Sequence, residues 1–323
     1  MVGPCRVMVT GASGFVGRHL CESLVQRDFS VKAAVRREPD LALAGDVVQL
    51  DLMDQVAVQQ SLVDVDCVVH LAGRAHVLND QVADPLAAFR QANVETTLAL
   101  AKAALAAGVK RFIFVSSIGV NGNETTGQAF TEQSDVAPAA DYAVSKLEAE
   151  QALDRLLAGT SMQLVVVRPP LIYDAGAPGN FARLLSLVAK GLPLPFAALD
   201  NRRSLVSLNN LISFLMLVIT HDKAAGQLFL IADGASVSTR QIVSSLAIGM
   251  GRKARCFYMP KLLARLLLSA VGRRAMYVQL FNSLEVSTSK ARDLLGWMPV
   301  EEPEAALAEA GRKHAKRLAV DAQ

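Results

Sequence analysis

A tyrosine and a lysine four residues apart, Tyr142 and Lys146, could form an acid/base pair in the stretch DYAVSKLEAE. Four residues make about one turn of helix, so both side chains would project from one face. An ammonium group near a phenol favours the phenolate, and we expect it to lower the pKa of Tyr142. Such a phenol can exchange a proton with a sugar or alcohol oxygen. The alternative is an ordinary surface pair, because this spacing also arises by chance.

Two serines upstream could share that substrate oxygen. Ser116 and Ser117 end an apolar run in FVSSIGVNG. Ligands of open α/β sheets bind at the carboxyl ends of the strands. We therefore expect Ser117 to hold the oxygen on which Tyr142 acts.

A glycine pattern near the beginning of the chain predicts a dinucleotide site. The stretch TGASGFVG follows the apolar run VMV and precedes a helical pattern. A glycine allows a sharp turn from strand to helix, and the start of the helix offers N–H groups to a pyrophosphate. The alternative is a plain turn, and the position between strand and helix favours the dinucleotide. The residues predicted to contact it here are Gly11, Ser13, Gly14, Phe15, Val16 and Gly17.

The end of the second predicted strand indicates which cofactor is preferred. NAD enzymes usually carry Asp or Glu there for the ribose hydroxyls, but this chain has Arg36 and Arg37. Two guanidinium groups can pair with a 2′-phosphate, which favours NADP(H) over NAD(H). The alternative is a pair of solvated loop charges. Asp51 and Leu52, after the third strand, could bound the adenine, and Asp51 could equally cap a helix.

The elements that must position these residues alternate along the first half of the chain. Short apolar runs at 6–9, 30–35, 47–50, 67–71, 111–116 and 163–167 predict buried parallel strands, and helical patterns cover 14–27, 53–62, 85–107 and 142–157. This alternation predicts a Rossmann-type, doubly wound α/β sheet. Further strands are expected at 205–208 and 227–232, with a helix at 210–219. We assign 1–168 and about 205–235 to the dinucleotide domain, and about 169–204 and 236–323 to a smaller substrate domain.

Taken together, the glycine pattern, the strand-end serine, Y-x-x-x-K and the stretch RPPLIY resemble the extended short-chain dehydrogenase/reductase family, also called the NAD-dependent epimerase/dehydratase family. The resemblance implies that Ser117, Tyr142 and Lys146 form the catalytic triad, with Lys146 also binding the nicotinamide ribose. It implies a structural role for Asn93 in a proton-relay region. It places further cofactor contacts at Leu71, Ala72, Gly73, Asn93, Ser116, Tyr142 and Pro169.

Within that family the chain resembles the nucleotide-sugar branch, which implies a UDP-linked substrate. The predicted substrate residues are Ser117, Asn121, Asn180 and Arg203, the last two on the diphosphate; the alternative for Arg203 is a structural ion pair. Asn121 stands where epimerases carry an aromatic residue. The likeness is to 4-reductases of UDP-4-keto-6-deoxy-N-acetylhexosamines in surface-polysaccharide synthesis. A UDP-sugar 4-epimerase with bound NAD, and a non-catalytic NADP(H) sensor, are the alternatives.

Composition bears on three further questions: whether the protein binds nucleic acid, holds a metal ion or inserts into a membrane. Hydrophobic residues make up 52% of the 323 residues and the net charge is +3, which indicates a folded protein and disfavours nucleic acid as a partner. The four cysteines form no C-x-x-C pair, and the five histidines show no metal spacing, so no metal site is predicted. His70 is expected to be a packed structural histidine. A cytoplasmic protein without stable membrane insertion is expected, and a homodimer is left open.

One segment near the C-terminal end has a second interpretation. YMPKLLARLLLSAVGRRAM could be a basic amphipathic helix on a membrane surface. Because apolar stripes usually face a core, we expect it to pack inside the substrate domain.

Overall fold

The computed structural model describes residues 5–39, 41–75, 82 and 84–321. Its centre is a seven-stranded parallel sheet in the order β3-β2-β1-β4-β5-β6-β9. The strands are β1 (Arg6–Thr10), β2 (Ser30–Val35), β3 (Asp46–Gln49), β4 (Cys67–His70), β5 (Arg111–Val115), β6 (Gln163–Arg168) and β9 (Gln227–Leu230). The order reverses between β1 and β4, which is where doubly wound folds bind their ligands. The predicted Rossmann-type fold is confirmed.

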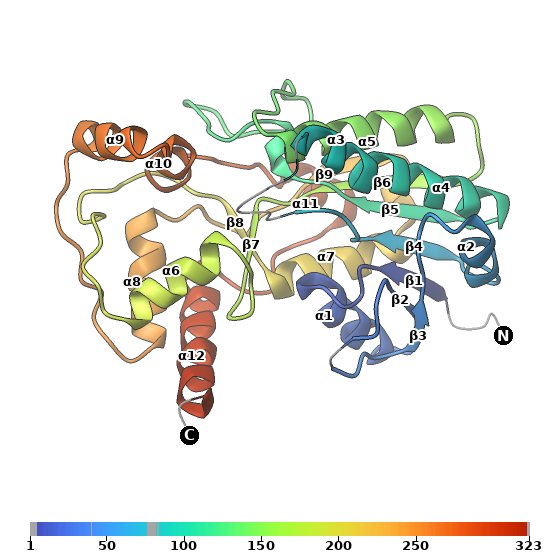
Figure 1. Ribbon diagram of the computed structural model, residues 1–323, viewed down its shortest axis with the longest axis horizontal. Helices are drawn as coiled ribbons and strands as arrows, with labels where there is room; N and C mark the ends of the chain where they lie inside the picture. Colours follow the sequence, from blue (N-terminus) through green and yellow to red (C-terminus); the bar gives the residue numbers. More distant parts are fainter. Residues whose placement is uncertain (1–4, 40, 76–81, 83, 322–323) are drawn as a thin grey trace.

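Helices cover both faces of this sheet (Figure 1). One face packs against α1 (Phe15–Val25), α7 (Leu208–Thr220) and α11 (Ser289–Leu295). The other packs against α2 (Gln55–Ser61), α4 (Thr96–Ala106) and α5 (Asp141–Leu157). Successive strand residues point to opposite faces, so Val7 and Val9 of β1 enter the first core while Met8 enters the second. This explains why the middle of most strands is apolar on both faces.

The predicted helix over 85–107 is interrupted in its middle. It consists of α3 (Pro85–Arg90), a π-helical turn (Gln91–Glu95) and α4. Two threonine hydroxyls donate to carbonyl groups of the π-helical turn: Thr96 to Gln91 at 3.0 Å and Thr97 to Asn93 at 2.7 Å. Such π-helical turns often occur at functional sites.

The remaining elements gather at one end of the sheet, on the left of Figure 1. They are β7 (Leu171–Tyr173), β8 (Leu205–Ser207), α6 (Asn180–Ala189), α8 (Thr239–Gly249), α9 (Lys261–Ala270), α10 (Arg274–Phe281) and α12 (Pro303–Asp321). Most of them share a separate apolar core around Phe181, Leu246 and Leu307. Single short helical turns lie at Ile118–Val120 and Asp222–Ala224.

The strand predicted at 205–208 forms, but it does not extend the main sheet. β8 pairs in parallel with β7, and β9 takes the place beside β6. The three residues of β7 directly follow Pro169 and Pro170, and a run this short carries no period. The domain boundaries given above remain a prediction.

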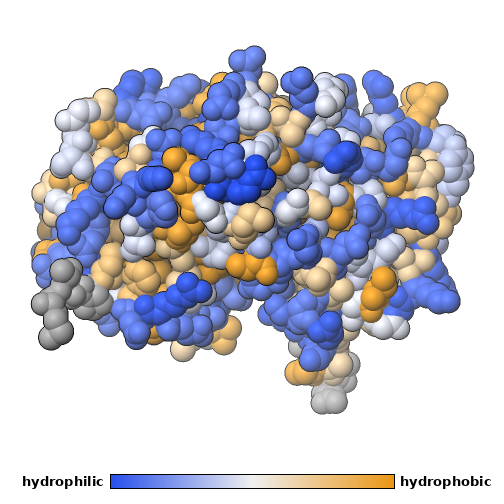
Figure 2. Space-filling view, turned by 180° about the vertical axis from the view of Figure 1, so that it is seen from behind, coloured by the Kyte–Doolittle hydropathy of each residue, from blue (hydrophilic) through white to orange (hydrophobic). Residues whose placement is uncertain are grey.

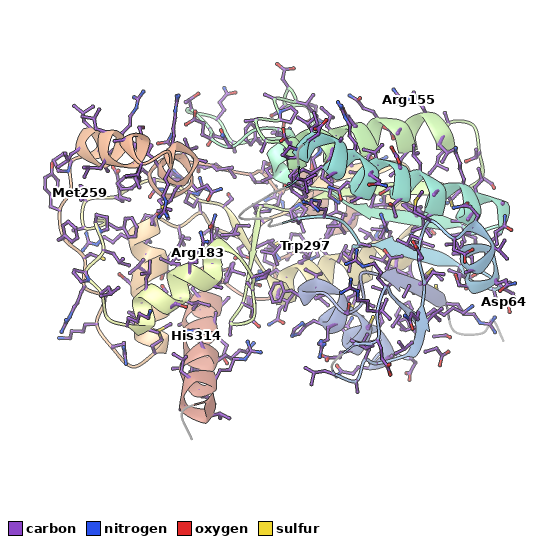
Figure 3. The ribbon with its side chains drawn as sticks, viewed as in Figure 1. Asp64, Arg155, Arg183, Met259, Trp297 and His314 are labelled. Carbon is purple, nitrogen blue, oxygen red and sulfur yellow. The ribbon has the colours of Figure 1, made fainter. Side chains whose placement is uncertain are left out.

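Near the C-terminal end of the chain, α11 and the following Trp297 pack onto α7, one of the helices that cover the sheet. Gly296 ends α11 in the left-handed conformation, with φ 68°. Trp297, labelled in Figure 3, then meets Phe214 edge-to-face with 5.2 Å between ring centroids. Its indole N–H donates to the Ser213 hydroxyl at 3.0 Å. The C-terminal segment is thereby fixed to the dinucleotide half of the molecule.

Candidate active site

The turn from β1 into α1 can only be built from glycine at two positions. Gly11 has φ +69°, and a Cβ there would lie 2.8 Å from the backbone nitrogen of Ala72. A Cβ at Gly17 would lie 2.2 Å from the carbonyl oxygen of Gly11. Side chains at these positions would push the first helical turn off the strand ends. The glycines therefore hold the start of α1 close to the switch point of the sheet.

This turn fits the pyrophosphate of a dinucleotide. Gly14 is the N-cap of the eleven-residue α1 and supplies no side chain to the first helical N–H groups. Ser13 and Gly14 are exposed, while Phe15 and Val16 are partly buried. Uncapped N–H groups at a helix start, with no side chain in front of them, suit an anionic ligand.

The residues predicted around the adenosine end lie at the ends of β2 and β3. Arg36 and Arg37 are exposed directly after β2, and with the rest of the described chain neither forms an ion pair or a side-chain hydrogen bond. Leu52 is partly buried. Asp51 accepts from the backbone N–H of Met53 at 3.0 Å, whereas the cap of α2 is Asp54. Asp51 is therefore a turn residue and does not cap that helix.

A third group of predicted residues meets at the end of β4. A Cβ on Gly73 would lie 3.0 Å from Asn93 Oδ1 and 3.6 Å from Lys146 Nζ. Asn93 is 1% exposed and lies in the π-helical turn. Its amide accepts from the Arg74 backbone N–H at 2.7 Å and donates to its carbonyl at 3.1 Å, fixing the segment that contains Leu71, Ala72 and Gly73.

Asn93 also connects this segment to the helix that carries Tyr142. Its Nδ2 donates to the Ser145 hydroxyl at 3.0 Å, and Ser145 donates to the carbonyl of Tyr142 at 2.8 Å. Ser145 was not among the predicted site residues. Its position inside Y-x-x-x-K, on the buried face of α5, is the signal that could have identified it.

The predicted lowering of the Tyr142 pKa is wrong for this structure. Burial raises the pKa of Tyr142 to about 12. Lys146 Nζ donates to the carbonyl of Val115 at 2.9 Å and lies 6.0 Å from the centroid of the Tyr142 ring. Burial lowers the pKa of Lys146 to about 8, against an opposing effect of Glu150. Desolvation of the phenol is the cause of this rise, and Tyr142 is neutral at neutral pH.

Ser117 lies beside this helix at the end of β5. Its hydroxyl accepts from the Gly119 N–H at 3.1 Å and caps the turn Ile118–Val120. A Cβ on Gly119 would lie 3.3 Å from both Ser117 Oγ and Ala143 Cβ, so the serine turn packs against the first turn of α5. The neighbouring Ser116 Oγ is buried and has no hydrogen-bond partner among the described residues. A buried hydroxyl left unpaired in this way is suited to a polar ligand.

Asn121 and Pro169 lie behind this turn. Pro169 is buried and accepts from the Ile118 N–H at 2.9 Å. Asn121 is 2% exposed; it accepts from Arg168 Nη1 at 3.0 Å and donates to the Ser134 carbonyl at 3.4 Å. Arg168 in turn pairs with buried Glu150. Both amide atoms of Asn121 are therefore used inside the protein, and its contact with substrate remains a prediction.

The two other predicted substrate residues lie outside this cluster. Asn180 begins α6 and donates to Gln279 Oε1 on α10 at 2.7 Å. Arg203 donates to the Asn282 carbonyl at 3.2 Å, and burial lowers its pKa to about 10. The guanidinium thus stays charged at neutral pH, and no carboxylate of the described residues pairs with it. The alternative, in which Arg203 forms a structural ion pair, therefore has no carboxylate among the described residues to support it.

A chain of hydrogen bonds under the site includes His70, which is fully buried as expected. Thr10 Oγ1 and His70 Nδ1 are 2.7 Å apart, and His70 Nε2 and Thr97 Oγ1 are 2.9 Å apart. Since the Thr97 hydroxyl donates to the Asn93 carbonyl, we assign the ring proton to Nε2, with Thr10 donating to Nδ1. The neutral imidazole thereby joins the end of β1 to the π-helical turn. Neither threonine was predicted as a site residue.

We expect this histidine to make stability depend on pH. Burial, and next the charge of Lys146, lowers the pKa of His70 to about 3 from 6.5. The unfolded chain therefore binds the extra proton as pH falls below 6.5, and stability declines by about 1 kcal/mol per pH unit between pH 6 and 5. Urea unfolding across this range measures the slope.

His70→Gln provides the matched comparison, since glutamine can hydrogen bond but does not titrate. Between pH 6 and 5, the decline in stability per pH unit should be smaller in this variant by most of the about 1 kcal/mol that we assign to His70. This holds whatever the absolute stability of the variant. His314, whose pKa is also lowered, is present in both proteins and cancels. Equal slopes would contradict the assignment of His70 as the titrating group.

Comparisons with known proteins show the family of this chain and support its fold. The model of the family described as "NAD dependent epimerase/dehydratase family" matches residues 7–232. A UDP-glucose 4-epimerase of Vibrio cholerae is 41% identical over 301 residues, which are 92% of this chain and 91% of that protein. A dTDP-6-deoxy-L-talose 4-dehydrogenase (NAD(P)(+)) of Kitasatospora kifunensis is 28% identical over 311 residues, 92% of this chain and 91% of that protein.

Solved structures show the same fold at lower identity. MoeE5 in complex with UDP-glucuronic acid and NAD superposes with a TM-score of 0.79 at 23% identity, covering 97% of this chain and 99% of that one. A UDP-glucuronic acid 4-epimerase from Bacillus cereus in complex with NAD gives 0.77 at 21%, with the same coverage. Within the described residues, no group of three or more His, Cys, Asp or Glu side chains is placed to hold a metal ion.

Proposed function

The chain belongs to the NAD-dependent epimerase/dehydratase family, and on that basis we propose that it is an NAD(P)-dependent oxidoreductase acting at C4 of a UDP-linked sugar. One observation carries the proposal. Gly73, Asn93, Ser117, Tyr142 and Lys146 converge from four segments on the carboxyl ends of β4 and β5. A non-catalytic sensor would have no use for a partly buried phenol beside a lysine at this place.

When bound, the nicotinamide would accept or donate the hydride at C4. Gly11, Gly14 and Gly17 would hold the pyrophosphate of the dinucleotide at the start of α1, and Lys146 would reach the nicotinamide ribose. Ser117 would hold the C4 oxygen, and Tyr142 would give that oxygen a proton on reduction or take one from it on oxidation. The neutral state of Tyr142 in this structure is the form that donates.

Substrate selection would rest on Arg203 and Asn180. A guanidinium that is partly buried without a carboxylate partner among the described residues can take the diphosphate as its counter-ion. NAD-bound UDP-sugar enzymes of the same fold support this class of substrate. The identity of the hexose stays open.

Two reactions fit this site, and we propose the reductase first. Arg36 and Arg37 stand at the end of β2 without a carboxylate, which favours NADPH as a consumed reductant. The neutral phenol of Tyr142 suits protonation of the oxygen formed on reduction. The substrate would be a UDP-4-keto-6-deoxy-N-acetylhexosamine. The epimerase is the second candidate, favoured by the UDP-glucose 4-epimerase of Vibrio cholerae, which is 41% identical to this chain over 301 residues.

The two reactions differ in whether the hydride stays on the sugar. A reductase should consume one NADPH per product, because the hydride stays on the sugar. We expect loss of NADPH absorbance with the 4-keto substrate, and no interconversion of UDP-N-acetylglucosamine and UDP-N-acetylgalactosamine or of UDP-glucose and UDP-galactose. Interconversion without net NADPH loss, by protein that purifies with NAD, would establish the epimerase instead.

Removing the two strand-end arginines should change cofactor choice. A charged hydrogen bond to a 2′-phosphate contributes about 1.5–3 kcal/mol, so Arg36→Ala with Arg37→Ala should weaken NADPH binding at least tenfold. NADH lacks that phosphate, and its affinity should change less than about twofold. Fluorescence titration with both cofactors measures the two effects.

Arg27→Ala, which removes an exposed charge at the end of α1, is the matched control and should leave both affinities unchanged. Tighter binding of NADH than NADPH by the parent protein, unaltered in the double variant, would contradict the preference for NADP(H).

A further inference from the structure

Helix α9 turns most of its leucines away from the protein. Leu262, Leu263, Leu266 and Leu267 are 68%, 46%, 59% and 52% exposed, and Ala264 is the helix residue that is buried. The expectation that this segment packs inside the substrate domain is therefore wrong for these leucines. At about 100° per residue, they occupy an arc of roughly 140° on the outer side of the helix.

The exposed apolar surface extends beyond the helix on both sides. Phe257, Tyr258 and Val271 are 42%, 68% and 66% exposed. We call this surface the α9 patch; it consists of Phe257, Tyr258, Leu262, Leu263, Leu266, Leu267 and Val271.

The α9 patch lies at the outer end of the molecule, where α9 packs on α10 (Figure 1). Inward contacts are made by Leu268 and Met259, the latter labelled in Figure 3. The rear face of the molecule differs, since its hydrophobic side chains lie in small groups among hydrophilic ones (Figure 2). An apolar surface of seven neighbouring large side chains indicates an interaction site.

Positive charge surrounds this patch. Between Asp233 and Glu285 the sequence contains no acidic residue. Five exposed basic residues lie in the same stretch of the chain as the apolar side chains: Arg255, Lys261, Arg265, Arg273 and Arg274. A fully exposed carboxylate from another segment, Asp200, pairs with Lys261 at 3.4 Å. The surface around α9 is thus both apolar and cationic.

We propose that the α9 patch docks on an anionic membrane surface. An interfacial helix needs an apolar face that enters the boundary of the acyl chains and cations that meet the headgroups, and α9 with its flanks supplies both. A second copy of this chain fits less well, because a two-fold interface would bring the same cations together. None of the described helices could cross a membrane, so the contact is confined to the surface.

The patch is connected to the substrate end of the candidate site through α10. Val271 is followed by α10, whose Gln279 accepts from Asn180 at the start of α6. Docking would hold that end of the enzyme near the bilayer and would release its product there. The proposal does not depend on C4 chemistry, because its test measures binding.

Sedimentation with vesicles tests the proposal. The full-length protein should pellet with vesicles of equal parts phosphatidylglycerol and phosphatidylcholine, and should remain in the supernatant with phosphatidylcholine alone. Raising the salt from about 0.05 to about 0.5 M should release it, because surface charges are screened. Leu262→Ser with Leu266→Ser should lower the binding constant at least about tenfold, and Arg273→Gln with Arg274→Gln about fivefold for each charge.

Val56→Ser is the matched control, since Val56 is 66% exposed on α2 at the opposite end of the molecule. It should bind vesicles like the parent, and all variants should keep parental turnover of a water-soluble substrate and parental melting temperatures. Equal binding to neutral vesicles, or parental binding by the leucine variant, would overturn the proposal. So would a dimer by light scattering that the leucine variant converts to monomer without any vesicle binding by the parent.

Discussion

Tyr142→Phe should lower turnover by about 10²–10⁴, the usual contribution of a general acid or base. The substitution removes the hydroxyl and keeps the ring, including its edge contact with Phe89 at 6.1 Å between centroids. No described residue hydrogen bonds to that hydroxyl, so no protein partner is left unpaired. Cofactor affinity and melting temperature should therefore stay near parental values. Steady-state kinetics with NADPH and the 4-keto sugar, a cofactor titration and a thermal melt give the three quantities.

Tyr258→Phe removes the same atom from a residue that is 68% exposed and outside the site. Its turnover should equal that of the parent. A Tyr142→Phe enzyme that works at the parental rate would exclude Tyr142 as the proton donor, and a loss confined to KM would assign it to binding.

Arg168→Met should destabilise the protein by about 3–5 kcal/mol, the cost of breaking a buried ion pair by removing one partner. Glu150 is 4% exposed and pairs with Arg168 at two positions, with 3.0 Å from Nε to Oε1. Without the guanidinium, its carboxylate loses that partner and Asn121 Oδ1 loses its donor. Urea unfolding at neutral pH measures the difference in the free energy of unfolding.

Adding Glu150→Leu to Arg168→Met should recover most of the lost stability, because an apolar pair avoids the buried charge. Arg90→Met is the matched single control, since Arg90 pairs with Glu148 at the surface, where solvent screens the pair, and should cost much less stability. A cost for Arg168→Met no larger than for Arg90→Met would contradict the assignment of a buried pair.

The parallel sheet could be predicted because its strands are apolar on both faces and alternate with helical periods. Every predicted strand in the first half lies within a residue or two of an observed one. β7 could not be predicted in the same way, since three residues after two prolines show no period. Its pairing with β8 depends on how the chain returns to the sheet, which local patterns do not contain.

The site was only partly predictable for a related reason. Spacing alone places Tyr142 and Lys146 on one helix face, but it does not say where the ammonium donates. The nearest acceptor is the carbonyl of Val115 on another element. Likewise, the apolar positions of α9 are visible in the sequence, while the side that faces the core depends on α10 and the loop before Pro260.

The π-helical turn makes the site sensitive to chain length rather than to residue type. A π-helical turn acts like one residue inserted into an α-helix. Deleting a single residue within 91–95 would allow a regular helix to form with α3 and α4 nearly in their present places, but the residues left in the turn would be displaced by up to one position, about 100° around the helix. With α3 and α4 held by their packing, the side chain of Asn93 would then lose its contacts with Arg74 and Ser145. A deletion that improves local helix geometry should therefore disconnect the site.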